Sequence, residues 1–128
     1  MIVLDAGALI AFLAPADALH ERAMESVLAA GPDALGISPI TRAEVLVGPV
    51  LAGTLERTQQ ALAALDVREV PLPADGALRL AGLRSRARLP LPDCCVVVAA
   101  QQCGGTILTF DERLATVAQG LGVGIQAG

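Results

Sequence analysis

The chain alternates short apolar runs with longer segments whose apolar residues recur at helical spacing. The short runs predict five strands, at residues 1–4, 35–38, 67–70, 106–109 and 123–125. The longer segments predict helices over 6–13, between Asp17 and Gly31, over 41–51, from 54, from Pro73, over 93–103 and over 111–119. Strands that alternate with helices indicate an α/β fold, in which helices cover both faces of a parallel sheet.

Three of these segments carry more specific expectations. The run 67–70 alternates between apolar and charged residues, which predicts a strand at the edge of the sheet. Gly48 and Pro49 are expected to kink or split the helix over 41–51. In the helix that begins at Pro73, we expect Leu78, Ala81 and Leu83 to face inward.

The segment 93–103 is apolar on every side. Its β-branched residues would allow a strand, but its length and the Gly104–Gly105 stop favour a buried helix. Pro90 and Pro92 predict a rigid, extended approach that delivers the chain to Asp93, where the helix is expected to begin.

Composition narrows the class of protein. The chain has 128 residues, 54% of them hydrophobic, and a net charge of −4, which predicts a single domain over residues 1–128. The absence of Lys excludes P-loop and Schiff-base chemistry, and a single His20 excludes a His-rich zinc site. Three Cys without a C-x-x-C pair indicate reduced thiols and a cytoplasmic location. We expect neither a signal peptide nor a membrane span.

Four carboxylates occupy similar places relative to the predicted elements. Asp5 and Asp111 follow strands, Glu44 lies early in the helix after the second strand, and Asp93 opens the buried helix. Ligands of open α/β sheets bind at the carboxyl ends of the strands, so these acids are expected to meet there. Taken singly, each Asp also fits an ordinary helix N-cap, and Glu44 fits a surface position. Together, oxygen ligands without nearby His or thiol favour Mg²⁺ or Mn²⁺, which can align a water for attack on a phosphodiester.

The order of these motifs resembles that of the PIN-domain ribonucleases, specifically the VapC-type toxins of bacterial toxin–antitoxin pairs. The resemblance covers nearly the whole chain. It rests on residues 2–11 (IVLDAGALIA), 38–45 (SPITRAEV), 89–93 (LPLPD) and 107–111 (ILTFD).

The resemblance implies a three-layer α/β/α fold with a five-stranded parallel sheet. It implies that Asp5, Glu44, Asp93 and Asp111 are the catalytic, metal-binding residues, with Thr109 supporting them. The implied activity is Mg²⁺- or Mn²⁺-dependent endonucleolytic cleavage of RNA, of the tRNA or rRNA class, by in-line attack of an activated water. Implied partners are a cognate antitoxin, whose tail covers the active site, and a second copy of the chain.

Two features depart from this picture. Gly7 stands where the family usually carries Ser, Thr or Asn, which removes a polar side chain near the metal. A pI near 4.8 is low for a nucleic-acid-binding protein, so attraction to RNA must come from local arginines. The candidates for substrate binding are Arg42, Arg86, Arg88 and Arg113.

Two other functions are alternatives to the nuclease. A catalytically silent PIN-like module that mainly binds its antitoxin is favoured by Gly7 and opposed by the complete set of acids. A haloacid-dehalogenase-type phosphatase also begins with Asp after the first strand. It requires a second Asp where Gly7 stands and a Lys that the chain lacks, and it is therefore rejected.

Overall fold

The computed structural model describes residues 1–126 and contains a four-stranded parallel sheet in the order β3-β2-β1-β4. The strands are β1 (Ile2–Leu4), β2 (Leu35–Ile37), β3 (Arg68–Glu69) and β4 (Thr106–Leu108). The predicted edge strand is confirmed, because the exposed β3 pairs with β2 alone. The two central strands, β1 and β2, are buried throughout, as their continuous apolar runs require.

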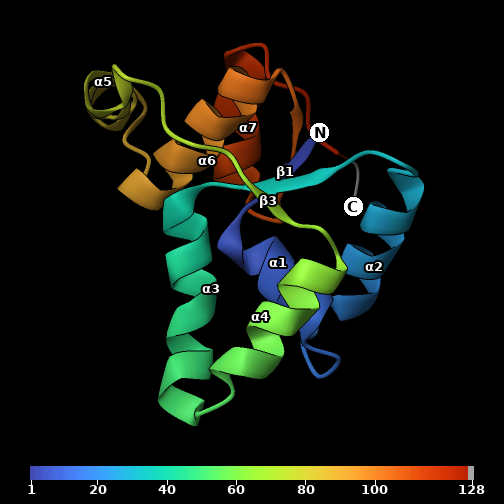
Figure 1. The fold of residues 1–128 in the computed structure, drawn as a ribbon. Helices are drawn as coiled ribbons and strands as arrows, with labels where there is room; N and C mark the ends of the chain where they lie inside the picture. Colours follow the sequence, from blue (N-terminus) through green and yellow to red (C-terminus); the bar gives the residue numbers. More distant parts are fainter. Residues whose placement is uncertain (127–128) are drawn as a thin grey trace.

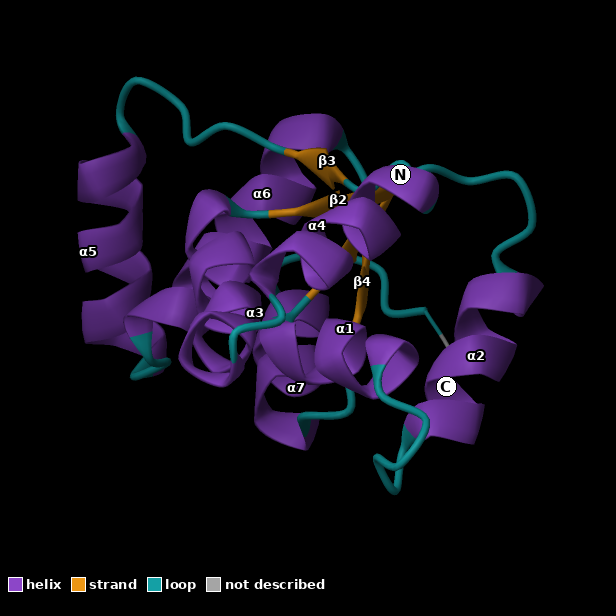
Figure 2. Ribbon diagram, turned by 60° about the horizontal axis from the view of Figure 1, so that its bottom comes forward, coloured by secondary structure: helices purple, strands orange, loops and turns teal. Residues whose placement is uncertain are grey.

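Helices cover both faces of the sheet, which confirms the three-layer α/β/α class (Figure 1). They are α1 (Ala6–Leu13), α2 (His20–Ala29), α3 (Pro39–Ala52), α4 (Leu55–Ala64), α5 (Gly76–Ala87), α6 (Leu91–Cys103) and α7 (Glu112–Gly120). Figure 2 shows the strands lying between these helices, with α5 and α2 at opposite ends of the molecule.

The pleat of β1 divides the core into two halves. Val3 packs with residues of α5, α6 and α7 on one face, whereas Ile2 and Leu4 pack with residues of α1, α3 and α4 on the other. Successive side chains of a strand point to opposite faces, so three residues of β1 anchor both layers.

Helix α6 is the most deeply buried helix and carries Asp93 at its start. Its residues from Cys94 to Ala100 are all buried, which confirms the preference for a helix over a strand. Gly104 ends it in a left-handed conformation with φ of 64°. The helix begins at Leu91 rather than at Asp93, because a proline in the first turn needs no backbone hydrogen bond. Asp93 therefore lies in the first turn and is not the cap.

The fifth predicted strand is wrong in extent. Ile125 forms an isolated parallel bridge with Ile107, so the direction of residues 123–125 is as expected, but only this one bridge forms. Gly122, with φ of 80°, turns the chain immediately before this segment, and Gly124 within it disfavours a regular strand because glycine has no side chain to pack.

Three helices also differ from expectation. Helix α3 runs unbroken through Gly48 and Pro49. Helix α2 begins at His20 rather than directly after Asp17, and the Asp17 side chain accepts a hydrogen bond from the N–H of Leu19, the residue before the helix. Helix α5 begins at Gly76, because residues 73–76 form a turn closed by the Gly76 N–H and the Pro73 carbonyl.

Helix α5 also presents a different side to the core. Leu83 is buried as predicted, but Leu78 is 77% exposed and Ala81 is exposed, while Leu80 packs against the core instead. The helix lies at a corner of the molecule and contacts mainly α6, so only a narrow stripe of it is covered. Within residues 1–126 no helix has the length and apolar character needed to cross a membrane.

Candidate active site

A pocket of about 440 Å³ opens at the edge of the sheet where the parallel strands end. All four predicted carboxylates line it: Asp5, Glu44, Asp93 and Asp111. They come from four elements that are distant in sequence, so the prediction that these side chains meet at the carboxyl ends of the strands is supported by their placement.

Asp5 is fixed at the bottom of the pocket. The residue is only 8% exposed, and it caps α1 by accepting a hydrogen bond from the Ala8 N–H at 2.8 Å through Oδ1. Its Oδ2 accepts a short hydrogen bond from the Thr109 hydroxyl. The carboxylate is thus both a helix cap and a wall of the pocket.

Thr109 joins two of the acids. Its Oγ1 donates to Asp5 and accepts from the backbone N–H of Asp111 at 3.0 Å. Asp111 in turn caps α7, accepting through Oδ1 from the Arg113 and Leu114 N–H groups at 2.9 and 3.1 Å. This chain of hydrogen bonds fixes Asp5 relative to Asp111, and it gives the buried Thr109 the supporting position expected from the sequence.

Glu44 and Asp93 reach the pocket from α3 and α6. Glu44 is exposed and Asp93 is half-buried. No hydrogen bond within residues 1–126 ties either carboxylate, in contrast to Asp5 and Asp111. The pocket therefore has two fixed carboxylates and two that are able to adjust.

The electrostatics of the pocket reflect this crowding. Burial and then the negative charges of Asp111, Asp5 and Glu44 raise the pKa of Asp93 to about 6. Burial also raises the pKa of Asp5 despite its two hydrogen bonds, and burial together with the charge of Asp5 raises the pKa of Glu44. Negative charge is costly here, so the pocket favours either protons or a cation.

Comparison with known proteins identifies the family of this chain. The PIN domain family matches residues 2–120. The chain belongs to the PIN domain family. PIN domains are generally nucleases.

Solved structures of the same fold include several toxin–antitoxin proteins. A toxin–antitoxin complex from Klebsiella pneumoniae is 28% identical, with 87% of each chain covered and a TM-score of 0.72. FitAcB from Neisseria gonorrhoeae is 23% identical, over 98% of this chain and 96% of that one, with a TM-score of 0.74. VapC20 of Mycobacterium tuberculosis, a sarcin–ricin loop cleaving toxin, is 19% identical over 91% and 95% of the chains, with a TM-score of 0.72. A search of curated protein sequences gives no match.

The donor set of this PIN domain suits a hard divalent cation. In the described part of the chain, no three His, Cys, Asp or Glu side chains gather closely enough to grip one ion directly. Mg²⁺ does not require such a cage, since it usually binds one or two carboxylates and keeps several waters. The pocket has room for those waters, and its oxygen-only donors disfavour Zn²⁺.

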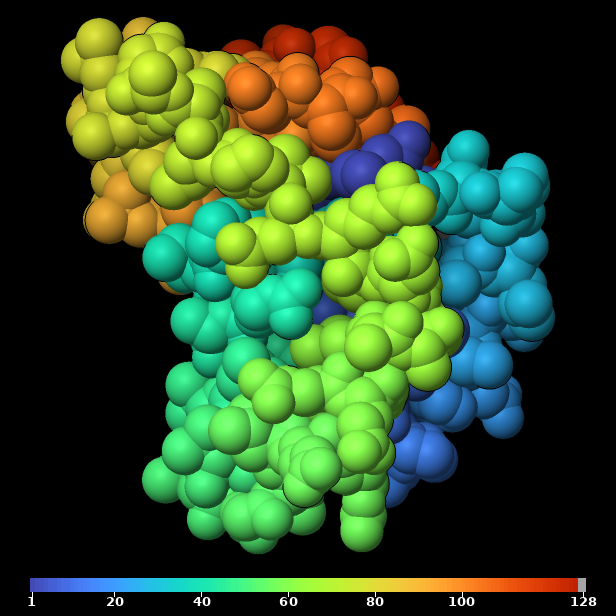
Figure 3. All heavy atoms as spheres, in the orientation of Figure 1, coloured from blue at the N-terminus to red at the C-terminus, as the bar shows by residue number. Residues whose placement is uncertain are grey.

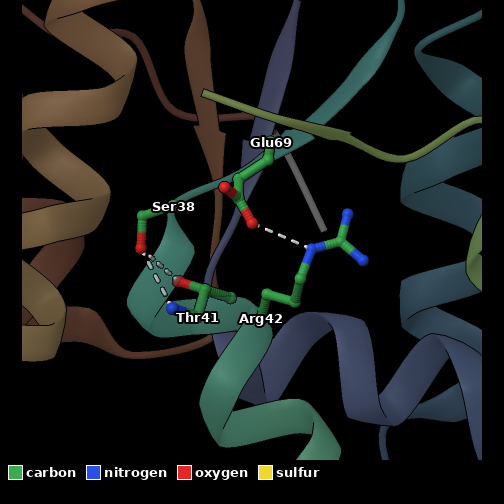
Figure 4. Close-up of polar contacts among 4 residues, drawn as sticks. All are labelled: Ser38, Thr41, Arg42 and Glu69. Atoms are coloured by element: carbon green, nitrogen blue, oxygen red, sulfur yellow. Dashed lines mark hydrogen bonds and ion pairs between the residues drawn. The ribbon is translucent and has the colours of Figure 1, made fainter. Parts of the chain in front are cut away.

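The arginines predicted to bind substrate have diverse surroundings. Arg42 lies on α3 but turns toward β3, where its Nε is 3.0 Å from Oε1 of Glu69 (Figure 4). Arg113 donates to the carbonyls of Ala87 and Arg88 and so covers the end of α5. Neither contact was visible in the sequence, because each joins residues more than 20 positions apart.

The other two predicted arginines lie at the end of α5. Arg86 is exposed beside Gly82, and Arg88 follows the helix in a left-handed conformation with φ of 56°. Neither residue lines the acidic pocket. Arg84 is not among the arginines predicted to bind substrate. Burial and the negative charge of Asp93 raise the pKa of the Cys94 thiol, and the nearby positive charge of Arg84 partly offsets that rise.

The pocket includes two residues that the sequence did not single out for it. Asp17 adds a fifth carboxylate from the loop before α2, and Phe110 adds an aromatic ring between Thr109 and Asp111. The Arg22 guanidinium lies over that ring, 4.8 Å from its centre. The Phe110 signal was available, since it stands inside the ILTFD motif, whereas Asp17 arrives through a loop that no local pattern specifies.

Proposed function

We propose that this PIN domain is a metal-dependent endoribonuclease, the toxin of a type II toxin–antitoxin pair. The observation that carries the proposal is the meeting of Asp5, Glu44, Asp93 and Asp111 in one pocket of a PIN fold. Such a concentration of raised carboxylate pKa values in a cleft is typical of a functional site rather than of a surface charge cluster.

The four carboxylates would hold Mg²⁺ or Mn²⁺ partly through waters bound to the ion, with Asp5 and Asp111 as the fixed side of the site. Each oxygen of Asp5 accepts one hydrogen bond and retains a lone pair for a ligand. When bound, the ion supplies positive charge that neutralises the acids and stabilises the leaving oxygen of the phosphodiester.

Glu44 and Asp93 orient the attacking water. Their carboxylates are free of hydrogen bonds within residues 1–126 and face the pocket, so they can accept hydrogen bonds from a water in line with the leaving oxygen. Attack on phosphorus then forms a P–O bond to the water oxygen as the P–O bond to the leaving oxygen breaks, without a covalent enzyme intermediate. One of the two carboxylates takes the proton of the water, and the leaving oxygen takes a proton from solvent. Thr109 positions Asp5 and Asp111 for this work.

The partners follow from the same proposal. A cognate antitoxin is supported by the Klebsiella toxin–antitoxin complex, and an RNA substrate of the tRNA or rRNA class by VapC20, a toxin that cleaves the sarcin–ricin loop. We propose that the protein acts in the cytoplasm and forms a homodimer, that its 128 residues are one domain, and that Arg42, Arg86, Arg88 and Arg113 contact the RNA.

A second function has one observation in its favour. A catalytically silent module that only binds its antitoxin would tolerate Gly7, which contributes no side-chain oxygen of its own to the pocket beside Asp5. The complete set of carboxylates favours the nuclease, because a binding module has no use for their mutual repulsion.

Cleavage of total cellular RNA with Mg²⁺ or Mn²⁺ tests the proposal, with EDTA and the Asp93→Asn protein as controls. The wild type should produce discrete fragments that disappear with EDTA and with Asp93→Asn. Unchanged fragments from the Asp93→Asn protein would contradict the assignment. Retained Mn²⁺ binding without any cleavage would favour the silent module.

A further inference from the structure

Helix α5 carries an arginine-rich surface on a protein of net negative charge. Four of its nine basic residues lie between positions 79 and 88, and residues 76–92 contain no Asp or Glu. Within residues 1–126, the ion pairs are made by Arg42 and Arg68, and none by these four arginines. Figure 3 shows α5 (yellow) at a projecting corner of the molecule, beside α6 (orange).

Two of these arginines line a separate pocket of about 280 Å³ between α5, α6 and the end of α7. Arg79 and Arg86 line it with Gln101, above apolar side chains of Leu83 and Leu121. Arg79 is held in place, because its Nη2 donates to Oε1 of Gln101 at 2.7 Å.

Gly82 lets the second guanidinium lie back against the helix. A Cβ at this position would lie 3.2 Å from Nη2 of Arg86, so even an alanine would require the guanidinium to shift by a few tenths of an ångström. Arg79, Gly82 and Arg86 are three and four positions apart, which places them on one side of α5. Two like charges therefore share one pocket with no carboxylate between them.

This chemistry suits a phosphate. Guanidinium groups present planar, paired donors that match phosphate oxygens, and an anion would relieve the repulsion between the two arginines. The basic surface continues from this pocket, near the end of α6, through Arg84 and Arg88 toward Asp93 at its start. A polymer with regularly repeated negative charge fits such a track better than a single acidic side chain does.

We propose that the pocket of Arg79, Arg86 and Gln101 binds a backbone phosphate of the RNA whose scissile bond lies in the acidic pocket. This rests on the proposed nuclease function. Gln101 follows Asp93 by eight residues, roughly 12 Å along a helix, a span that a few nucleotides cover. Through this contact, a protein of net negative charge binds RNA outside the site of cleavage.

Binding without cleavage tests this directly. Fluorescence anisotropy in EDTA, with a labelled single-stranded 20-nucleotide RNA and with unfractionated tRNA as competitor, compares wild type with the double variant Arg79→Gln/Arg86→Gln. The matched control is Arg57→Gln/Arg68→Gln, which removes the same charge from α4 and β3. We expect the α5 variant to bind at least about fivefold more weakly, with its salt slope reduced by about 0.7, the value for one phosphate contact on a single strand.

A charge-neutral variant separates the pocket from the overall charge. Gln101→Ala removes the partner of Arg79 and places a good helix former on α6, so it should weaken RNA binding about twofold with an unchanged thermal transition. Equal losses in the α5 and control double variants would overturn the proposal. A loss of polyglutamate binding by the α5 variant, with RNA binding unchanged, would also overturn it, in favour of an acidic protein partner.

Failure of the nuclease assignment is distinguishable from failure of this site. Wild type that binds RNA through α5 but never cleaves it with Mn²⁺ would contradict the nuclease alone. Metal-dependent cleavage combined with RNA binding that ignores Arg79 and Arg86 would contradict the phosphate site alone.

Discussion

Asp93 combines the two properties on which the site depends, namely access to the pocket and a costly negative charge. Its pKa of about 6 in the folded protein exceeds the ordinary value of 3.8, so the folded state holds a proton that the unfolded state has lost between these values. The free energy of unfolding should therefore fall as the pH rises from 4 through 6. An aspartate at this position weakens the fold in neutral solution.

Replacement of Asp93 by Asn should consequently stabilise the protein at pH 8. We predict a gain of about 1 kcal/mol, less than the shift itself would convert to, because Asp93 is half-exposed and solvent screens its charge. The gain should vanish near pH 4, where the wild-type carboxyl is protonated in the folded protein. Chemical denaturation at both pH values measures this, and a variant less stable than wild type at pH 8 would contradict it.

The Thr109 hydroxyl should contribute more to stability and to cleavage than a buried hydroxyl ordinarily does. Thr109→Val keeps the shape but removes the donor to Asp5 and the acceptor for the Asp111 N–H. We predict a loss of stability of about 1–3 kcal/mol and a loss of cleavage of about 10–100-fold. Thr116→Val, which removes an exposed hydroxyl bonded only to the Glu112 carbonyl, is the matched control and should keep both stability and cleavage.

Gly7 is the position at which a substitution should strengthen metal binding. A Cβ there would meet only Oδ1 of Asp5, at an ordinary 3.8 Å, so a serine fits without strain. We predict that Gly7→Ser tightens Mn²⁺ binding about tenfold or more by adding an oxygen beside the site. Calorimetric titration measures this, with Gly7→Ala as the control that adds the Cβ without the oxygen. Equal effects of the two variants would contradict the account.

At the scale of elements, the start of α3 sets the position of Glu44. Ser38 is fully buried and caps the helix, with its Oγ accepting the Thr41 N–H at 3.0 Å and lying 3.0 Å from the Thr41 hydroxyl (Figure 4). Ser38→Ala should cost about 1–2 kcal/mol, measured by thermal unfolding. Thr54→Ala, at a helix start without a side-chain cap bond, should cost much less.

The helices and strands also show which features of the fold could be predicted from the sequence. Continuous apolar runs predicted β1 and the burial of α6, because hydrophobic pattern and strand period are local properties. The inward face of α5 was not predictable, since Leu78 is exposed where the helix projects beyond α6, the helix that it mainly contacts. The pairing of Arg113 with the end of α5 and the arrival of Asp17 at the pocket depend on contacts between distant segments.

The whole molecule separates its charges. Five of the thirteen carboxylates line the pocket at one edge of the sheet, whereas four of the nine arginines lie between positions 79 and 88. This separation is compatible with the proposed RNA substrate despite the net charge of −4. A bound divalent ion would offset part of the negative charge of the acidic pocket.

Mn²⁺ binding at pH 7, followed by electron paramagnetic resonance, tests this account most directly. Wild type should take up Mn²⁺, Asp5→Asn and Asp93→Asn should lose it while remaining folded, and Glu56→Gln on α4 should bind as wild type does. Equal Mn²⁺ uptake by wild type and Asp5→Asn would contradict the claim that these carboxylates form the metal site.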